Sequence, residues 1–390
     1  MSEIDVDYKA DISSPSGYSR AARSHIRALY ESNVGICAID QRHDTLDVVH
    51  DEWWMRHKRK LISKNPGSGI CIQQSTPEFY SPNPGQYNIA FLAFEADLIP
   101  NYDVQDNPRL NWVKQLNKMD EIWAPSSYLV DVYRRSGVRE DIPIKVMPHP
   151  IDHTTYKPGK KYEIFGTDRK PLADSTLKFM SCFQFSKRKN PYGLLSAYMS
   201  EFSSRDDVCL ILKTYGVDFT MQAQEMVIKQ INMFKKNFKQ RYGNPRILIQ
   251  LDQVSEEEMP ELMASADVGV STSYAEGFGL PIQEFMSCGI PTIVPKSSSF
   301  TDLVTEERGW LTKTYPIPIV GMTFLWYECY MKWWEIDILD YMAKMREAYN
   351  NRDIIKAKGI EARKFVEDTY TYSKVGKLMK DRLLEISQIR

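Results

Sequence analysis

A glycine-bearing loop between two glutamates has the residue types of an anion-binding site. Glu276 opens the stretch Glu-Gly-Phe-Gly-Leu-Pro-Ile-Gln-Glu, Glu284 closes it, and Pro281 suits the first turn of a helix. The free N–H groups of such a helix start, together with those of the loop, favour a bound anion such as a phosphate. Because the loop separates the two carboxylates, they do not share a helical face. One can therefore point at a sugar of a ligand while the other meets a different part of it.

This loop must be held at the edge of a sheet. The residues before it, 267–272, are predicted to form a buried parallel strand, and 290–294 to form the next one. The helix between them should end at Gly289, where a left-handed residue is wanted. In open parallel sheets, ligands bind at the carboxyl ends of the strands. The sequence therefore predicts the anion cradle at that edge.

Predicted strands and helices alternate in two series, separated by a stretch rich in proline and glycine at 149–173. Such alternation favours parallel sheets covered by helices on both faces. The predicted strands are 34–39, 70–73, 88–94, 121–124 and 144–147 in the first series, and 177–183, 208–212, 246–251, 267–272 and 290–294 in the second. The last third is expected to be helical and to end in an amphipathic helix at 373–389. The aromatic residues within 326–334 have spacings of 3 and 4, for which packing is favoured over a sugar platform.

The composition is that of an ordinary folded protein. The 390 residues include 50 Lys+Arg and 51 Asp+Glu, and the net charge of -1 argues against a polycationic nucleic-acid coat or an acidic tail. The six cysteines form no C-x-x-C pair, so no zinc or redox motif is indicated. No apolar run approaches the length of a membrane span. The acidic start, in which Asp5 and Asp7 are expected to be frayed, lacks a secretory signal pattern, so we expect a cytoplasmic protein.

The segment 276–284 resembles the E-x7-E signature of retaining glycosyltransferases with the GT-B fold, in particular family 4. The flanking residues 265–268 and 286–294 are similar to that family as well. Further stretches that resemble it are 14–20, 120–126, 146–152 and 185–191. The resemblance implies two Rossmann-like α/β domains with a cleft between them and a last helix that crosses back to the N-terminal domain. It implies an N-terminal, acceptor-side domain at 1–155, a nucleotide-sugar donor domain at 170–370, and packing of 373–390 on the first.

The resemblance also implies roles for individual residues. Glu276 would face the donor sugar, Glu284 would bind the nucleotide ribose, and Lys189 would hold the diphosphate and stabilise the departing nucleoside diphosphate. The remaining donor-binding residues would be Gly17, Arg188, Gly277, Phe278, Gly279, Leu280 and Val254. The donor would be UDP- or GDP-linked and serve as substrate, with no cofactor and no metal. The reaction would retain the configuration of the sugar.

Two positions depart from the family pattern. An arginine often stands about six residues before the lysine, but the chain has Phe183 there, and Lys187 or Arg188 would have to supply the second positive charge. The family also often has a histidine after a strand of the first domain. The corresponding stretch, 88–97, contains none, and Glu95 is its nearest polar group, which makes Glu95 a candidate on the acceptor side.

Other functions fit parts of this pattern. A nucleotide-sugar epimerase or a glycosyl phosphorylase would use the same fold, although the phosphorylase needs a far longer chain. A non-catalytic binder of sugars or nucleotides is the third alternative, which stays open because Phe183 stands where the family often has an arginine.

The acceptor is not indicated by the motifs. Arg56, Lys58, Arg59 and Lys60 follow two tryptophans, 53 and 54, in the expected acceptor-side domain. An ordinary helix with a buried tryptophan and solvated cations explains this cluster. An anionic surface is a second explanation, either a lipid or lipid-linked acceptor at a membrane periphery or a nucleic acid. A small-molecule acceptor is also open.

Overall fold

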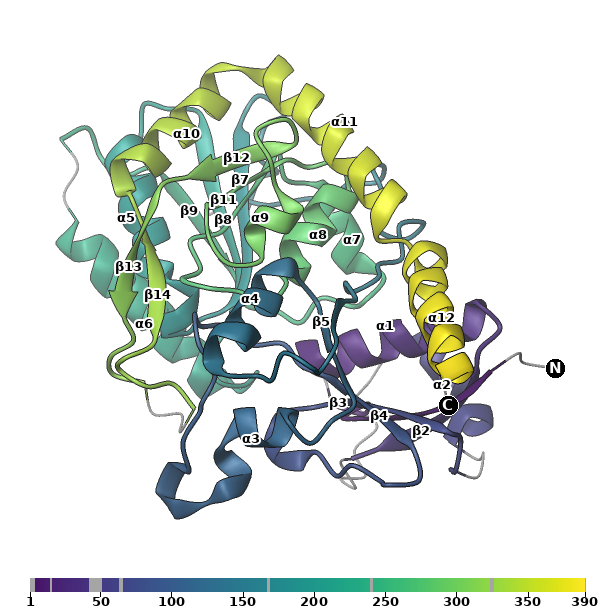
Figure 1. The fold of residues 1–390 in the computed structure, drawn as a ribbon. Helices are drawn as coiled ribbons and strands as arrows, with labels where there is room; N and C mark the ends of the chain where they lie inside the picture. The colour runs from purple at the N-terminus through teal and green to yellow at the C-terminus, as the bar shows by residue number, and fades with distance from the viewer. Residues whose placement is uncertain are drawn as a thin grey trace. The chain divides into compact units, whose positions relative to one another are not determined.

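The computed structural model describes residues 4–14, 16–41, 51–62, 66–166, 169–238, 241–322 and 326–389. They divide into two compact units (Figure 1). The first unit consists of 1–152, 318–332 and 368–390, and the second of 153–317 and 333–367. The donor domain expected at 170–370 includes 318–332, which this division places in the first unit.

The first unit is built on a six-stranded parallel sheet in the order β2-β1-β3-β4-β5-β6. Its strands are β1 (Asp5–Ala10), β2 (Gly35–Asp40), β3 (Ile70–Gln74), β4 (Tyr87–Phe91), β5 (Glu121–Ala124) and β6 (Ile144–Val146). The expectation that Asp5 and Asp7 lie in a frayed start is wrong, because both are in β1, an interior strand of the sheet. Asp7 is buried and its carboxylate accepts hydrogen bonds from the Gly67 N–H and the Gln86 side chain, whereas Asp5 is exposed, so both acidic residues are tolerated there.

The helices of the first unit follow from their caps and apolar faces. They are α1 (Gly17–Glu31), α2 (Glu52–Ile62), α3 (Trp112–Leu116), α4 (Ser127–Ser136) and α12 (Tyr372–Ile389), with short 3-10 turns at Pro77–Phe79, Val104–Asp106 and Pro108–Leu110. Ser16 caps α1 by accepting from the Ser19 N–H at 3.2 Å. The predicted C-terminal helix is α12, which lies beside α1 in Figure 1 and contributes Val375, Met379 and Leu383 to the core of this unit.

The second unit is built on a second six-stranded sheet in the order β12-β11-β10-β7-β8-β9, whose pairings are parallel. Its strands are β7 (Leu177–Gln184), β8 (Val208–Tyr215), β9 (Arg246–Gln250), β10 (Val268–Val270), β11 (Thr292–Pro295) and β12 (Gly309–Thr312). Its helices are α5 (Pro191–Glu201), α6 (Met221–Asn237), α7 (Glu258–Ala264), α8 (Leu280–Ser287), α9 (Phe300–Leu303), α10 (Ile338–Asn350) and α11 (Arg352–Thr369).

Alternate residues of these strands pack on opposite faces, as a strand requires. Leu210 and Leu212 of β8 belong to a core cluster with residues of α5, α6 and α10. On the other face, a Cβ added at Gly269 of β10 would meet the ring of Phe285 of α8. Both faces are therefore covered, and the expected pair of Rossmann-like parallel-sheet units is confirmed.

The last third is less helical than expected. Beyond β12, a two-stranded sheet joins β13 (Thr314–Pro318) to β14 (Lys332–Ile336). The aromatic residues with helical spacing therefore include Trp333 and Trp334 of a strand, and tertiary pairing overrides the local pattern. Trp326 and Tyr327 instead lie in the segment that belongs to the first unit.

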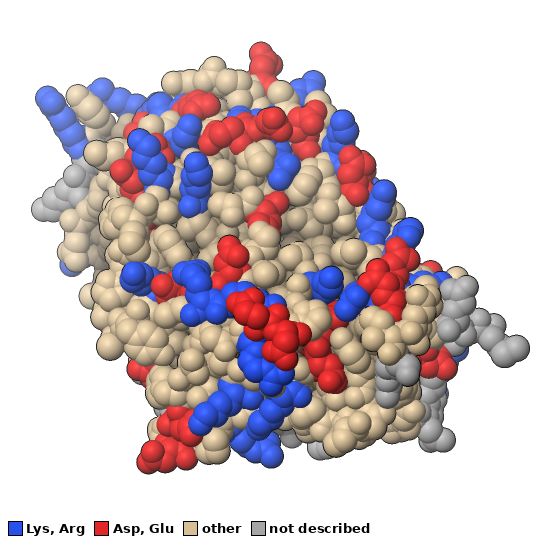
Figure 2. Space-filling model, viewed as in Figure 1, with Lys and Arg blue, Asp and Glu red and all other residues tan. Residues whose placement is uncertain are grey.

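Charges of both signs are intermixed over the face seen in Figure 2, in line with the near-zero net charge. Among the described residues, no helix has both the length and the apolar character to cross a membrane.

Candidate functional site

The candidate site lies where the strand order of the second sheet reverses. β7 is followed in sequence by β8 on one side of it, whereas β10 pairs on the other side. Such a reversal leaves room at the carboxyl ends of the two central strands, and ligands bind there in open α/β sheets. Lys189 follows β7, and Glu276 follows β10. The topology therefore brings together two residues that are 87 positions apart.

A basic turn after β7 carries the two cations of the site, Arg188 and Lys189. Lys187–Lys189 form a 3-10 turn, and Asn190, with a φ of 49°, caps α5 by accepting from the Gly193 N–H. The loop after β10 holds this turn, because the Tyr274 N–H donates to the Arg188 carbonyl at 2.8 Å and the Thr272 hydroxyl donates to the Asn190 carbonyl at 2.8 Å. These bonds fix the backbone from which the cationic side chains extend.

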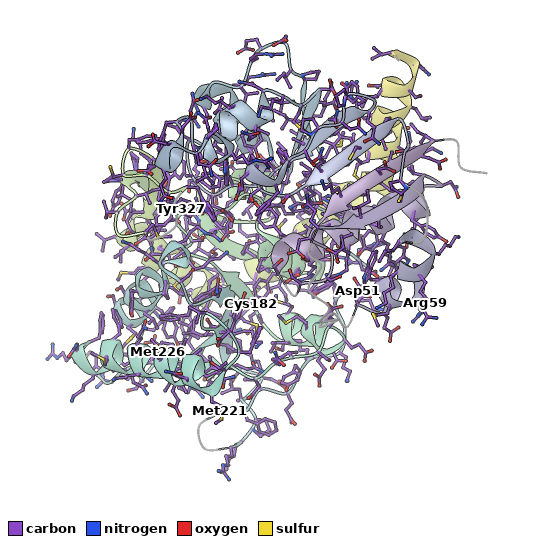
Figure 3. The ribbon with its side chains drawn as sticks, turned by 90° about the horizontal axis from the view of Figure 1, so that it is seen from below. Asp51, Arg59, Cys182, Met221, Met226 and Tyr327 are labelled. Atoms are coloured by element: carbon purple, nitrogen blue, oxygen red, sulfur yellow. The ribbon has the colours of Figure 1, made fainter. Side chains whose placement is uncertain are left out.

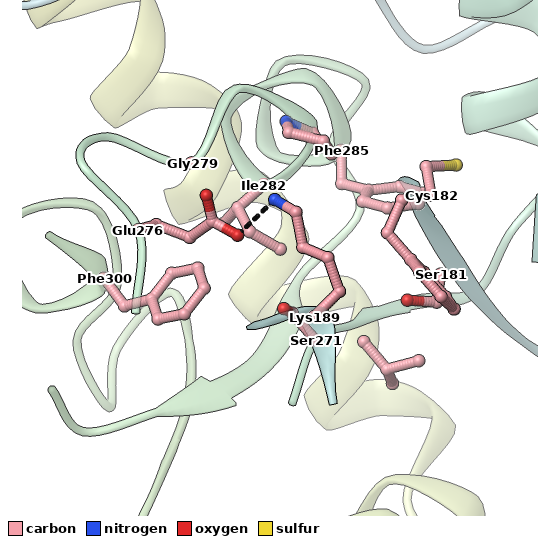
Figure 4. Close-up of a pocket in the computed structure, with 12 residues that line it drawn as sticks. Ser181, Cys182, Lys189, Ser271, Glu276, Gly279, Ile282, Phe285 and Phe300 are labelled. Atoms are coloured by element: carbon pink, nitrogen blue, oxygen red, sulfur yellow. Dashed lines mark hydrogen bonds and ion pairs between the residues drawn. The ribbon is translucent and has the colours of Figure 1, made fainter. Parts of the chain in front are cut away.

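The carboxylate of Glu276 binds both cations. Figure 4 shows the Lys189 ammonium pointing at this carboxylate, with which it forms an ion pair, and Arg188 Nη1 lies 3.0 Å from its other oxygen. Arg188 also donates to the Ala275 carbonyl at 2.8 Å. Burial alone raises the pKa of Glu276, but the charges of Lys189 and Arg188 outweigh it and lower the pKa to about 2. Glu276 is therefore ionised at neutral pH.

Two serines after β11 hold the backbone of Glu276. The Glu276 N–H donates to the Ser298 hydroxyl at 3.2 Å, and the Ser299 hydroxyl donates to the Glu276 carbonyl at 2.8 Å. Neither serine is predicted from the sequence, because no local motif links residues 298 and 299 to the loop. The one signal in the sequence was their position just after the predicted strand 290–294, at the sheet edge where ligands bind.

The helix start predicted from Pro281 is the N-terminus of α8. Gly279 is its N-cap, with a φ of 100° that favours glycine. A pocket of the second unit lies beside this helix start (Figure 4) and is lined by Ser181, Cys182, Phe183, Lys189, Val270, Ser271, Glu276, Gly279, Pro281, Ile282, Phe285 and Phe300. The pocket thus joins an anion-favouring helix start, a cation and a carboxylate.

Glu284 lies inside α8 and is buried. Burial first, and then the negative charge of Glu284, raise the pKa of the Cys182 thiol. The two glutamates of the motif therefore differ in position: Glu276 lines the pocket, and Glu284 is buried within α8.

The other predicted site residues are distributed over both units. Gly277, Phe278 and Leu280 belong to the loop and helix start of the site, and Val254 is half-buried in the loop after β9. Arg188, and not the exposed Lys187, supplies the second positive charge at Glu276. Phe183, where an arginine was expected, lines the pocket.

Gly17 and Glu95 lie in the first unit. Gly17 begins α1 and is exposed. The carboxylate of Glu95 accepts a hydrogen bond from the Tyr327 hydroxyl at 3.0 Å. That partner comes from the segment 318–332, and no local pattern in the sequence indicates this contact.

Comparison with known protein families places the site in one matched segment. Residues 171–317 match the family described as Glycosyl transferases group 1, and this range contains Lys189, Glu276 and Glu284. O-antigen chain mannosyltransferase B of Escherichia coli is 44% identical over 56 residues, which are 14% of this chain and 15% of that protein. The GDP-mannose-dependent alpha-(1-6)-phosphatidylinositol dimannoside mannosyltransferase of Mycobacterium tuberculosis is 40% identical over 48 residues, 12% of this chain and 13% of that protein. The matches therefore span only a small part of either relative.

Solved structures resemble the chain over nearly its whole length. Anabaena HepE in complex with UDP and glucose has a TM-score of 0.65 at 13% identity, covering 98% of this chain and 100% of that one. Sucrose-phosphate synthase from Thermosynechococcus elongatus has a TM-score of 0.66 at 12% identity, covering both chains completely. At these identities the likeness establishes the fold, which is that of GT-B glycosyltransferases.

Proposed function

We propose that the protein is a retaining glycosyltransferase that moves a sugar from a nucleoside diphosphate to an acceptor. The observation that carries this proposal is the convergence of Lys189 and Arg188 on Glu276 beside the helix start of α8. The match of 171–317 to Glycosyl transferases group 1 supports it. The names of the two mannosyltransferases and the sugar nucleotide ligands of HepE agree with a nucleotide-sugar donor.

The two cations and the helix start would hold the diphosphate. Glu276 forms ion pairs with both cations, and on donor binding phosphate oxygens would replace its carboxylate as their partner. Glu276 would then accept hydrogen bonds from hydroxyls of the donor sugar, and Glu284 from those of the ribose. Cations fixed where negative charge develops stabilise a leaving diphosphate without reorganisation, so we expect activity without a divalent metal.

In the proposed reaction the bond between the sugar C1 and the phosphate oxygen breaks, and a bond from C1 to the acceptor oxygen forms on the same face of the sugar. The acceptor proton passes to the departing phosphate oxygen. Lys189 and Arg188 stabilise the charge on the leaving nucleoside diphosphate. This sequence retains the anomeric configuration and needs no nucleophile from the protein.

A panel of UDP-, GDP- and ADP-sugars tests the proposal. Slow release of nucleoside diphosphate from one donor, and NMR of the product showing an unchanged anomeric configuration, are the expected results. An epimerised donor sugar would indicate an epimerase. Tight binding with no turnover in the presence of any acceptor preparation would indicate a non-catalytic binder, and an inverted product would contradict the retaining mechanism.

A further inference from the structure

A buried lysine lies beside the candidate site and has no part in the proposed sugar transfer. Lys213, near the carboxyl end of β8, is 7% exposed. An ammonium group is costly to bury unless it has partners. Within the described residues, Lys213 Nζ makes one hydrogen bond, to the Asp252 carbonyl at 2.5 Å. An ammonium has three N–H donors, so donors are left for a ligand.

The register of the sheet places Lys213 next to the pocket. Lys213 pairs with Cys182 of β7 on one side and with Gln250 of β9 on the other. Its neighbour Leu212 packs into the core with α5 and α10, so Lys213 faces the opposite side of the sheet, where Cys182 Sγ lies 3.7 Å from Met263 Sδ of α7. Cys182 lines the pocket and is labelled in Figure 3, as are the exposed α6 residues Met221 and Met226.

The order of the strands gives the direction in which a nucleotide would extend. Under the proposed function, Glu276 after β10 meets the sugar and Lys189 after β7 meets the diphosphate. Lys213 lies beside Cys182 in the register of the sheet, and the charge of Glu284, the proposed ribose ligand, also acts on the pKa of that thiol. The next strands are β8 and β9. The base would therefore lie over their ends, at Lys213 and Asp252.

We propose that Lys213 and the Asp252 carbonyl read the nucleobase and select bases with adjacent C=O and N–H groups. Lys213 donates to the base carbonyl, and the second lone pair of the Asp252 oxygen accepts from the base N–H. Uracil has this edge at O4 and N3–H, and guanine has it at O6 and N1–H. Cytosine and adenine present an amino group and a bare ring nitrogen instead. The amino group would place a donor against the Lys213 ammonium, and the ring nitrogen would place an acceptor against the Asp252 carbonyl. This inference rests on the proposed function, since it needs a nucleotide in the site.

Burial lowers the pKa of Lys213, against the raising effects of Cys182 and Asp252. A ligand carbonyl that accepts from this ammonium compensates part of the cost of burial, whereas a base without one leaves that cost in place. Loss of a hydrogen bond to a charged group weakens binding by roughly 10- to 100-fold.

The test is the dissociation constants of UDP, CDP, GDP and ADP, measured by calorimetry on the wild type and on Lys213→Met. UDP and CDP differ mainly in the base edge that Lys213 and the Asp252 carbonyl would contact, and so do GDP and ADP. We expect the wild type to bind UDP more tightly than CDP, GDP more tightly than ADP, or both, by at least about 10-fold. In Lys213→Met this ratio should fall to within about 3-fold, mostly through weaker UDP or GDP binding. Lys229→Met, at an exposed lysine of α6, is the matched control and should keep the wild-type ratio.

The outcomes separate this inference from the function on which it rests. If the wild type binds the members of each pair equally, or if Lys213→Met weakens all four ligands alike, Lys213 does not read the base, although nucleotide binding stands. The wild-type comparison decides this even if the variant does not fold. If none of the four binds, the proposed function itself is wrong and the inference falls with it.

Discussion

The Glu276 carboxylate is held ionised by two cations that the proposed donor also needs. Because its pKa is about 2 in the folded protein and ordinarily 4.5, the unfolded chain takes up a proton at a higher pH than the folded one. The contribution of this group to stability is therefore present above pH 4.5 and is lost as the pH falls towards 2. This shift corresponds to about 3 kcal/mol at most.

Replacing Glu276 by Gln should remove that part of the pH dependence. We expect the free energy of unfolding of the wild type to fall more steeply between pH 5 and 3 than that of Glu276→Gln, by up to about 1.4 kcal/mol per pH unit. Urea unfolding at several pH values measures it. Equal slopes for the two proteins would mean that the ion pairs do not hold Glu276 ionised.

The two glutamates of the motif should differ in their kinetic effects. Ribose hydroxyls are bound in both ground and transition states, so Glu284→Ala should weaken nucleotide binding. Charge at the sugar ring develops only in the transition state, so Glu276→Ala should mainly lower kcat. Steady-state kinetics on one donor compare the two variants. Full turnover by Glu276→Ala would refute its assigned role.

At the scale of the element, α2 combines a buried anchor with exposed cations. Trp54 is buried, and Trp53 stacks on His57 with ring centroids 4.5 Å apart, as expected for an ordinary helix. Arg56, Arg59 and Lys60 are exposed on the same helix, and Figure 3 shows Arg59 extending outwards. Such cations are attracted to an anionic surface by about 1 kcal/mol each.

Charge reversal tests whether α2 binds a polyanion. The variant with Arg56, Lys58, Arg59 and Lys60 all changed to Glu should keep donor hydrolysis but lose binding to vesicles with anionic lipid or to oligonucleotides. The binding of the wild type should weaken steeply with salt. A control with four exposed lysines of the second unit reversed, Lys229, Lys236, Lys356 and Lys364, should bind as the wild type does. If the wild type binds neither polyanion at low salt, α2 is an ordinary solvated helix.

The helix α12 provides a matched pair of leucines. Leu383 is fully buried in the core of the first unit, whereas Leu378 is 44% exposed. Leu383→Ala should destabilise that unit by about 2–5 kcal/mol, and Leu378→Ala by roughly 0.5 kcal/mol or less. Hydrogen–deuterium exchange of α1, against which α12 packs, should accelerate only in Leu383→Ala. Equal exchange in both variants would contradict the packing of α12.

The elements predicted from the sequence are those with a local signal. Most strands of both sheets have unbroken apolar runs, and Pro281 identified the start of α8. The strand β1 was missed because Asp5 and Asp7 look solvent-exposed, although only Asp5 is exposed and the buried Asp7 accepts from the Gly67 N–H and the Gln86 amide. Ser298 at Glu276 and Tyr327 at Glu95 were missed because each contact joins segments distant in the sequence.

At the scale of the whole molecule, neither unit is a continuous stretch of chain. The chain passes from one unit to the other after residues 152, 317, 332 and 367. The first unit therefore contains residues from the beginning, the late middle and the end of the sequence. A fragment that ends at 152 would lack the core residues of α12 and the Tyr327 partner of Glu95. Functional tests therefore require the full chain.

The central claim is that the cations after β7 hold the diphosphate of a nucleotide sugar. The most direct measurement is the dissociation constant of the best donor for the wild type, Lys189→Met and the matched control Lys187→Met, in which an exposed lysine of the same turn is changed. We predict binding that is weaker by roughly 10- to 100-fold in Lys189→Met, with donor turnover reduced further, and no change in Lys187→Met. Equal affinity in all three proteins would contradict the account.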